Sequence, residues 1–91
     1  MKHLRSARHR ALCAVIIEAR EAAGLTQRQL AARLKRSQPW VTYIETGQRR
    51  LDVLEFIEIA HALRVDAQQL FAKLAGRPAL DRWRTARRGS K

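Results

Sequence analysis

The residues with the clearest chemical potential lie in one short segment, residues 38–46, which reads Gln-Pro-Trp-Val-Thr-Tyr-Ile-Glu-Thr. If this segment is helical, a rotation of about 100° per residue puts Val41 and Ile44 on one side, where they can enter a core. The other side carries amide, hydroxyl and phenol groups, which can bond to base edges or phosphate oxygens in a DNA groove. The candidates for contact near the bases are Gln38, Pro39, Thr42 and Tyr43.

Two helices joined by a tight turn are predicted to position this segment. Thr26 and Gln29 have the spacing of a capping box, so the first helix should begin at Thr26. Ser37 is the expected cap of the second helix, and Pro39 then falls in its first turn, where proline costs little. The turn between the two helices is residues 35–37, Lys-Arg-Ser.

Trp40 falls at the boundary between the two faces of the second helix. We expect it to pack against the core, with contact to the DNA backbone as the alternative.

Three more helices are expected around this pair. The first runs from about Arg10 to Ala23 and is ended by Gly24. Two more begin at further capping boxes, Asp52 with Glu55 and Asp66 with Gln69, and run to about residues 63 and 75. The apolar positions expected to enter the core are Leu12, Ile16, Ala19 and Ala23 in the first helix, with Val15 or Ile17 alongside, Leu30, Ala31 and Leu34 in the second, Val53, Phe56, Ile57, Ile59 or Ala60 and Leu63 in the fourth, and Leu70, Phe71 and Leu74 in the fifth.

The chain resembles the helix-turn-helix family of phage repressors and Cro, also called the XRE family. The residues that carry the resemblance are Gly24-Leu25-Thr26-Gln27, Leu30-Ala31, Ser37-Gln38, Val41, Ile44-Glu45 and Gly47, followed by Leu54 to Leu63 and Val65-Asp66. The resemblance implies an all-α, five-helix, lambda-repressor-like DNA-binding domain with a helix-turn-helix over about residues 10–75. A basic N-terminal arm, residues 1–9, and a basic C-terminal tail or short helix, residues 76–91, would flank it.

The resemblance also implies roles for single residues. It pairs Arg20 with Glu45, and it places Gln27 beside a phosphate while bracing Gln38. Lys35 stands where the family usually has glycine, so a left-handed backbone is expected there and at the similar helix end, Arg64. The residues expected to contact phosphate are Gln27, Arg28, Lys35, Arg36, Thr46, Arg49 and Arg50, and the possible dimer contacts are Leu70, Phe71, Leu74, Leu80 and Trp83.

The charge balance agrees with a nucleic-acid partner. The 91 residues carry a formal net charge of +11, which is typical of a nucleic-acid binder, with a solvated cationic surface as the alternative. Residues 26–50 are strongly basic, whereas acidic residues outnumber basic ones over residues 52–75. We therefore expect one side of the molecule to face phosphate and the other to face away.

The sequence favours a sequence-specific, double-stranded-DNA-binding transcriptional regulator, a phage-type repressor that binds a palindromic operator as a homodimer. The alternative is an antitoxin or another protein-binding module, whose partner would be a toxin or a regulator. An enzyme is not expected, because no paired carboxylates, Ser/His/Asp set or phosphate-binding glycine loop is present.

No cofactor or metal is expected, since His3 and His9 have no ligand partners nearby in the sequence. The single cysteine, Cys13, cannot form an internal disulfide, and no apolar run approaches the length of a membrane span. A cytoplasmic protein is therefore expected.

Overall fold

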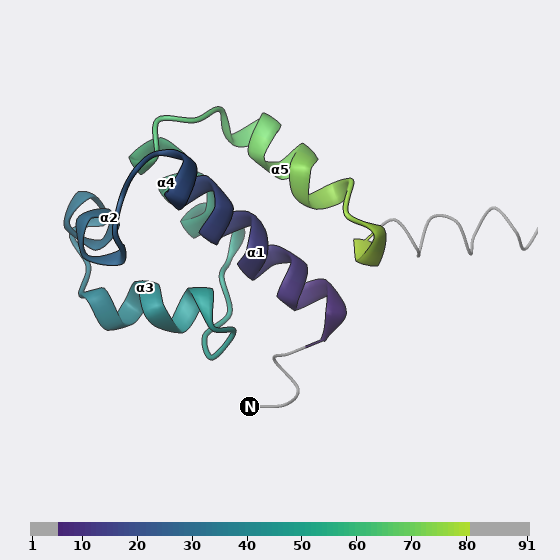
Figure 1. The fold of residues 1–91 in the computed structure, drawn as a ribbon, viewed down its shortest axis with the longest axis horizontal. Coiled ribbons are helices and arrows are strands. Elements are labelled where there is room, and N and C mark those ends of the chain that lie inside the picture. The colour runs from purple at the N-terminus through teal and green to yellow at the C-terminus, as the bar shows by residue number, and fades with distance from the viewer. Residues whose placement is uncertain (1–5, 81–91) are drawn as a thin grey trace, which may run out of the picture.

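The computed structural model describes residues 6–80, and the regular structure within that range is entirely helical (Figure 1). The helices are α1 (Ala7–Ala22), α2 (Gln27–Leu34), α3 (Gln38–Glu45), α4 (Val53–Ala62) and α5 (Ala67–Ala75). Residues 78–80 are also helical, at the end of the described range. The predicted all-α class with five helices is confirmed.

Side-chain caps explain where most of these helices begin. Thr26 and Asp52 each form a complete capping box, with Gln29 in α2 and Glu55 in α4. At α5, the Asp66 carboxylate accepts bonds from two backbone N–H groups, those of Gln68 and Gln69, in place of the reciprocal box that was predicted. In each case an oxygen satisfies N–H groups that have no partner inside the helix.

The first helix is longer than predicted at its N-terminal end. It begins at Ala7 instead of Arg10, because the Ser6 hydroxyl accepts a bond of 3.1 Å from the N–H of His9 and so caps the helix. Residues 7–9 therefore belong to α1 and not to a separate arm. The rest of the predicted arm, residues 1–5, lies outside the described residues.

The left-handed positions are those predicted. Lys35 has φ of 57° and Arg64 has φ of 61°. At Lys35 this conformation lets the N–H of Arg36 return to the carbonyl of Ala31 at 3.0 Å, the pattern that commonly closes a helix at glycine. A cation at the C-terminal end of a helix offsets part of the cost of a side chain in this conformation.

A single core joins the five helices. Ile16 of α1 and Leu30 of α2 are completely buried, and α4 packs against both α2 and α5. The α1 helix lies between α3 and α5 in the view of Figure 1 and is in contact with both. The buried hydrophobic cluster is Val15, Ile16, Leu30, Ala31, Val41, Phe56, Ile59, Ala60, Leu63 and Leu70.

Four predicted core residues are wrong: Val53 and Ile57 of α4, Ala23 of α1, and Phe71 of α5, which is 53% exposed. Val53 lies in the first turn of α4 and is 67% exposed, while Ile57 is 39% exposed. The reason is that the buried stripe of α4 runs from Phe56 to Leu63 at helical spacing, and Ile57 lies about 100° away from it. Ala23, the C-cap of α1, is exposed as well.

No helix among residues 6–80 is both long enough and apolar enough to cross a membrane.

Candidate nucleic-acid interface

The third helix separates its side chains as predicted. Val41 and Ile44 are buried, and Glu45 is buried with them. Gln38 and Pro39 are exposed, and Tyr43 is 47% exposed. The α3 helix has eight residues, so its exposed face is short. The side chains on that face can form hydrogen bonds to bases.

A buried ion pair fixes α3 to α1. Nε of Arg20 donates to Oε2 of Glu45 at 2.6 Å, and Nη2 donates to Oε1 at 3.1 Å. The third guanidinium nitrogen, Nη1, donates to the carbonyl of Leu25 at 2.8 Å. The Glu45 side chain is only 3% exposed, and this bond to the carboxylate raises the pKa of Arg20. The structure thus places the two residues of the predicted pair in direct, two-bond contact.

Gln27 connects this ion pair to α2, and it also bonds to Thr42 instead of Gln38, the residue that was expected. Its Nε2 donates to Oε1 of Glu45 at 2.9 Å, and its Oε1 accepts from the Thr42 hydroxyl at 2.7 Å. Since a carboxylate only accepts hydrogen bonds, Glu45 orients the amide and leaves the carbonyl for Thr42. Gln27 therefore braces Thr42 and not Gln38.

These bonds change what Thr42 can offer to DNA. Its hydroxyl proton is used by Gln27, and its side chain is half-buried. The hydroxyl oxygen keeps acceptor capacity, and the methyl group can touch an apolar edge such as the thymine methyl. On the same helix, the Thr46 hydroxyl donates to the carbonyl of Thr42 at 2.8 Å and accepts from Gln48 at 3.1 Å.

The opposite flank of α3 is cationic. Arg36, which precedes the helix, lies over the Trp40 ring at 4.3 Å from its centroid, and Arg49, which follows the helix, lies over it at 5.1 Å. Trp40 is half-buried and packs against the core, as expected, while its face also supports two arginines. Arginine over an indole face is a favourable arrangement.

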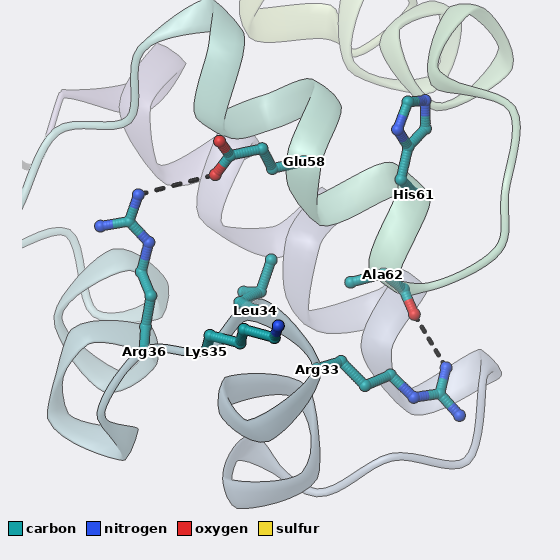
Figure 2. A pocket seen from close by; sticks show the side chains of 7 residues that line it. All are labelled: Arg33, Leu34, Lys35, Arg36, Glu58, His61 and Ala62. Carbon is teal, nitrogen blue, oxygen red and sulfur yellow. Dashed lines mark hydrogen bonds and ion pairs between the residues drawn. The ribbon is translucent and has the colours of Figure 1, made fainter.

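Both of these arginines are paired with acidic residues of α4. Arg49 donates to the two carboxylate oxygens of Glu55 at 2.9 and 3.0 Å, and Arg36 lies 3.6 Å from a carboxylate oxygen of Glu58 (Figure 2). The bond from Arg49 holds the pKa of Glu55 below its ordinary value, although burial acts in the other direction. The expected separation into a basic side and an acidic side is therefore wrong at this flank, because Glu55 and Glu58 lie beside the basic loop.

The turn between α2 and α3 borders a polar groove of about 570 Å³ at the end of α4. Arg33, near the end of α2, and Arg36, in the turn, point in different directions (Figure 2). Arg33 donates to the carbonyl of Ala62 at 2.8 Å, so it binds the last turn of α4. The lining residues are Arg33, Leu34, Lys35, Arg36, Glu58, His61 and Ala62.

Two other residues predicted to contact phosphate are exposed cations. Arg28 and Arg50 make no ion pair with another residue in the described part of the chain. The pKa of His9 is lowered mainly by burial and also by the positive charge of Arg50. Within residues 6–80 no group of three His, Cys, Asp or Glu side chains could hold a metal ion.

The predicted dimer residues do not share one surface. Leu70 is 4% exposed and belongs to the core, Leu74 packs against that core, and Leu80 is half-buried. Phe71 is 53% exposed, and Trp83 lies outside the described residues. Burial of Leu70 agrees with its predicted place in the core, and its assignment as a dimer contact is wrong because it lies on the inner side of α5.

An exposed apolar surface that was not predicted lies around Phe71. Val53, Leu54 and Ile57 of α4 are 67%, 69% and 39% exposed, and we call these three residues and Phe71 the α4–α5 patch. A groove of about 270 Å³ runs between the two helices, and Val53, Ile57 and Phe71 line it whereas Leu54 lies outside it. In the sequence, Leu54 was one of the residues that carry the resemblance to the family, and Ile57 was expected in the core. The spacing of apolar residues therefore did not indicate that both would be exposed.

The ion pair yields a stability prediction. We expect Arg20→Met and Glu45→Leu each to lower the free energy of unfolding by about 3–5 kcal/mol, because each leaves a buried charge without its partner. The double variant should lose much less than the sum. Urea unfolding of the four proteins measures this. Single losses below about 1 kcal/mol, the range of exposed pairs, would contradict a structural role for the pair.

Comparison with known proteins agrees with this geometry. A family profile described as a helix-turn-helix domain matches residues 2–74. The chain is also similar to a solved structure of an XRE-family like protein from Pseudomonas syringae pv. tomato str. DC3000, with 45% identity and a TM-score of 0.71. That match covers 80% of this chain and 89% of the other.

A second solved structure, the clp gene regulator ClgR from C. glutamicum, has the same fold. It is 24% identical, with a TM-score of 0.70, and the match covers 79% of this chain and 94% of the other. No curated protein matches the chain significantly. Since the helix-turn-helix profile spans most of the chain and the Pseudomonas relative is 45% identical, the chain belongs to the XRE-type helix-turn-helix family of DNA-binding regulators.

Proposed function

We propose that this chain is a sequence-specific transcriptional regulator, a repressor of phage type, which inserts the exposed face of α3 into the major groove of double-stranded DNA. One observation carries the proposal. The face that bears Gln38, Pro39 and Tyr43 is exposed, while the reverse of the same helix is held by the Arg20–Glu45 pair. A short helix with a fixed back and a polar, exposed front can be placed in a groove without reorganisation.

The proposed contacts divide by chemistry. The Gln38 amide can form two bonds to adenine, and Tyr43 can reach a base edge or a phosphate. Gln27 is the first residue of α2, so its backbone N–H can meet a phosphate with the positive end of the helix dipole. Additional phosphate contacts are proposed for Arg28, Lys35, Arg36, Thr46, Arg49 and Arg50. The DNA-binding unit we propose spans residues 6–75.

Replacing the exposed reading residues tests the contact with bases. We expect Gln38→Ala with Tyr43→Ala to weaken binding to a selected duplex at least tenfold and to reduce its preference over a scrambled duplex, since each good base contact contributes about 1–3 kcal/mol. Fluorescence anisotropy with labelled duplexes measures both quantities. Gln69→Ala, which removes an exposed glutamine from α5, is the matched control. Unchanged preference in the double variant would exclude α3 as the reading element.

We infer further that the regulator binds as a homodimer through the α4–α5 patch. Leu54 and Val53 are each about two-thirds exposed, and Phe71 adds an aromatic ring that meets Phe56 edge-on at 6.2 Å. Contiguous exposed apolar side chains of this kind mark interaction surfaces. Two copies on a palindromic operator would place their reading helices about one DNA turn, roughly 34 Å, apart.

A charge in this patch should disrupt the dimer. We expect Leu54→Glu to shift the protein to monomers in light scattering after size exclusion, because carboxylates would face each other across an apolar contact. Ala32→Glu makes the same change in charge at an exposed site on α2 and should leave the dimer intact. A Leu54→Glu protein that remains dimeric would contradict this interface.

The same patch favours a second candidate function. An apolar groove of about 270 Å³ between two helices can also accept a segment of another protein, as in an antitoxin that binds a toxin. The two proposals differ in stoichiometry. A wild-type protein that is monomeric at micromolar concentration, and that binds DNA without a dimeric site, would favour the protein-binding module.

A further inference from the structure

The carboxylate of Glu55 lies at the centre of the cationic flank of α3. Glu55 is 9% exposed. Its Oε1 accepts from Nη1 of Arg49 and from the backbone N–H of Asp52, both at 3.0 Å, and its Oε2 accepts from Nη2 of Arg49 at 2.9 Å. Nη2 of Arg36 approaches the same Oε2 at 4.0 Å. One carboxylate therefore caps α4 and faces two arginines.

The two arginines reach this carboxylate from opposite ends of the recognition helix. Arg36 precedes α3 and Arg49 follows it, yet both lie over the ring of Trp40, which belongs to the first turn of α3. Two guanidinium groups this close repel each other unless a negative charge lies between them. Glu55 supplies that charge, so the cluster of Arg36, Trp40, Arg49 and Glu55 is mutually stabilised.

The bonds to Glu55 leave donors available. A guanidinium has five N–H donors arranged along two edges that can each bind an oxyanion with two bonds. Arg49 uses Nη1 and Nη2 for Glu55 and for the carbonyl of Arg50, and within residues 6–80 no hydrogen bond involves its Nε. Its Nε–Nη2 edge can therefore bind a phosphate while the other edge stays on Glu55.

We propose that Glu55 is a positioning residue of the DNA interface, which holds Arg49 and Arg36 as a two-arginine clamp for the DNA backbone beside α3. This inference rests on the proposed function, in which these arginines contact phosphate. A held arginine loses less side-chain freedom on binding than a mobile one, so a negative residue strengthens the binding of a negative partner. If net charge alone determined the affinity, the negative charge of Glu55 would weaken the binding to DNA.

The test compares two variants that each remove one negative charge, one inside the cluster and one outside it. Glu55→Gln keeps an oxygen that can accept from the N–H of Asp52, so the helix cap survives while the ion pair is lost. Glu21→Gln removes an exposed carboxylate of α1, which makes no ion pair with another residue in the described part of the chain. Both are titrated against a selected duplex at several salt concentrations, at a temperature where circular dichroism shows folded protein.

We expect Glu55→Gln to bind about tenfold more weakly than the wild type, the loss of roughly one charge-assisted contact. The slope of log K against log salt should fall by about 0.9, the value for one phosphate contact. Glu21→Gln should bind as tightly as the wild type or more tightly. Arg49→Lys keeps the positive charge but loses the two edges of the guanidinium, so it should weaken the binding by the same factor. This variant leaves the N-terminal cap of α4 unchanged.

Three results would overturn the inference. If Glu55→Gln binds as tightly as Glu21→Gln with an unchanged salt slope, Glu55 only neutralises charge or stabilises the fold, and the proposed function survives. If Glu55→Gln does not fold, Arg49→Lys decides, and wild-type affinity in that variant contradicts the clamp. A wild-type protein that shows no salt-dependent duplex binding removes the proposed function as well as the clamp.

Discussion

The orientation of α3 depends on one buried ion pair, Arg20 with Glu45. The pair joins α1 to α3, and Gln27 carries the same network into α2 through bonds to Glu45 and Thr42. Three helices are thus connected by polar groups that have little access to water, and each group forms a hydrogen bond with the next. A buried charge without its partner is costly, so this network permits one arrangement of α3 on the core.

The exposed face of α3 lies between two flanks of different character. On one side, Gln27 and Thr42 form a neutral hydrogen-bonded contact with α2. On the other side, Arg36 and Arg49 lie over Trp40 and are paired with acidic residues of α4. The first flank fixes the geometry of the reading residues, and the second can add phosphate contacts.

The elements that sequence reasoning predicted well are those with local causes. The caps at Thr26, Ser37, Asp52 and Asp66 lie within three residues of the N–H groups they bind, so they can be read directly from the sequence. The pairing of Arg20 with Glu45 crosses 25 positions and was accessible only through resemblance to a family.

The features that were missed depend on tertiary contacts. The α4 helix is apolar around much of its circumference, so periodicity could not decide that Phe56 faces inward and Ile57 outward. The contacts of Arg36 and Arg49 with Trp40 and Glu55 bring together residues from two loops and two helices. No linear spacing encodes such a cluster, and this is why charges were expected to separate where they in fact pair.

The central claim is that α3 reads a DNA sequence from a position fixed by this network. Selection from a random duplex pool, followed by titration of the enriched duplex at two salt concentrations, tests it most directly. The account predicts an enriched palindrome with half-sites about one DNA turn apart and an affinity that falls steeply as salt rises. Salt-sensitive binding without any enriched sequence would contradict it, because only a basic surface attracted to phosphate would then remain.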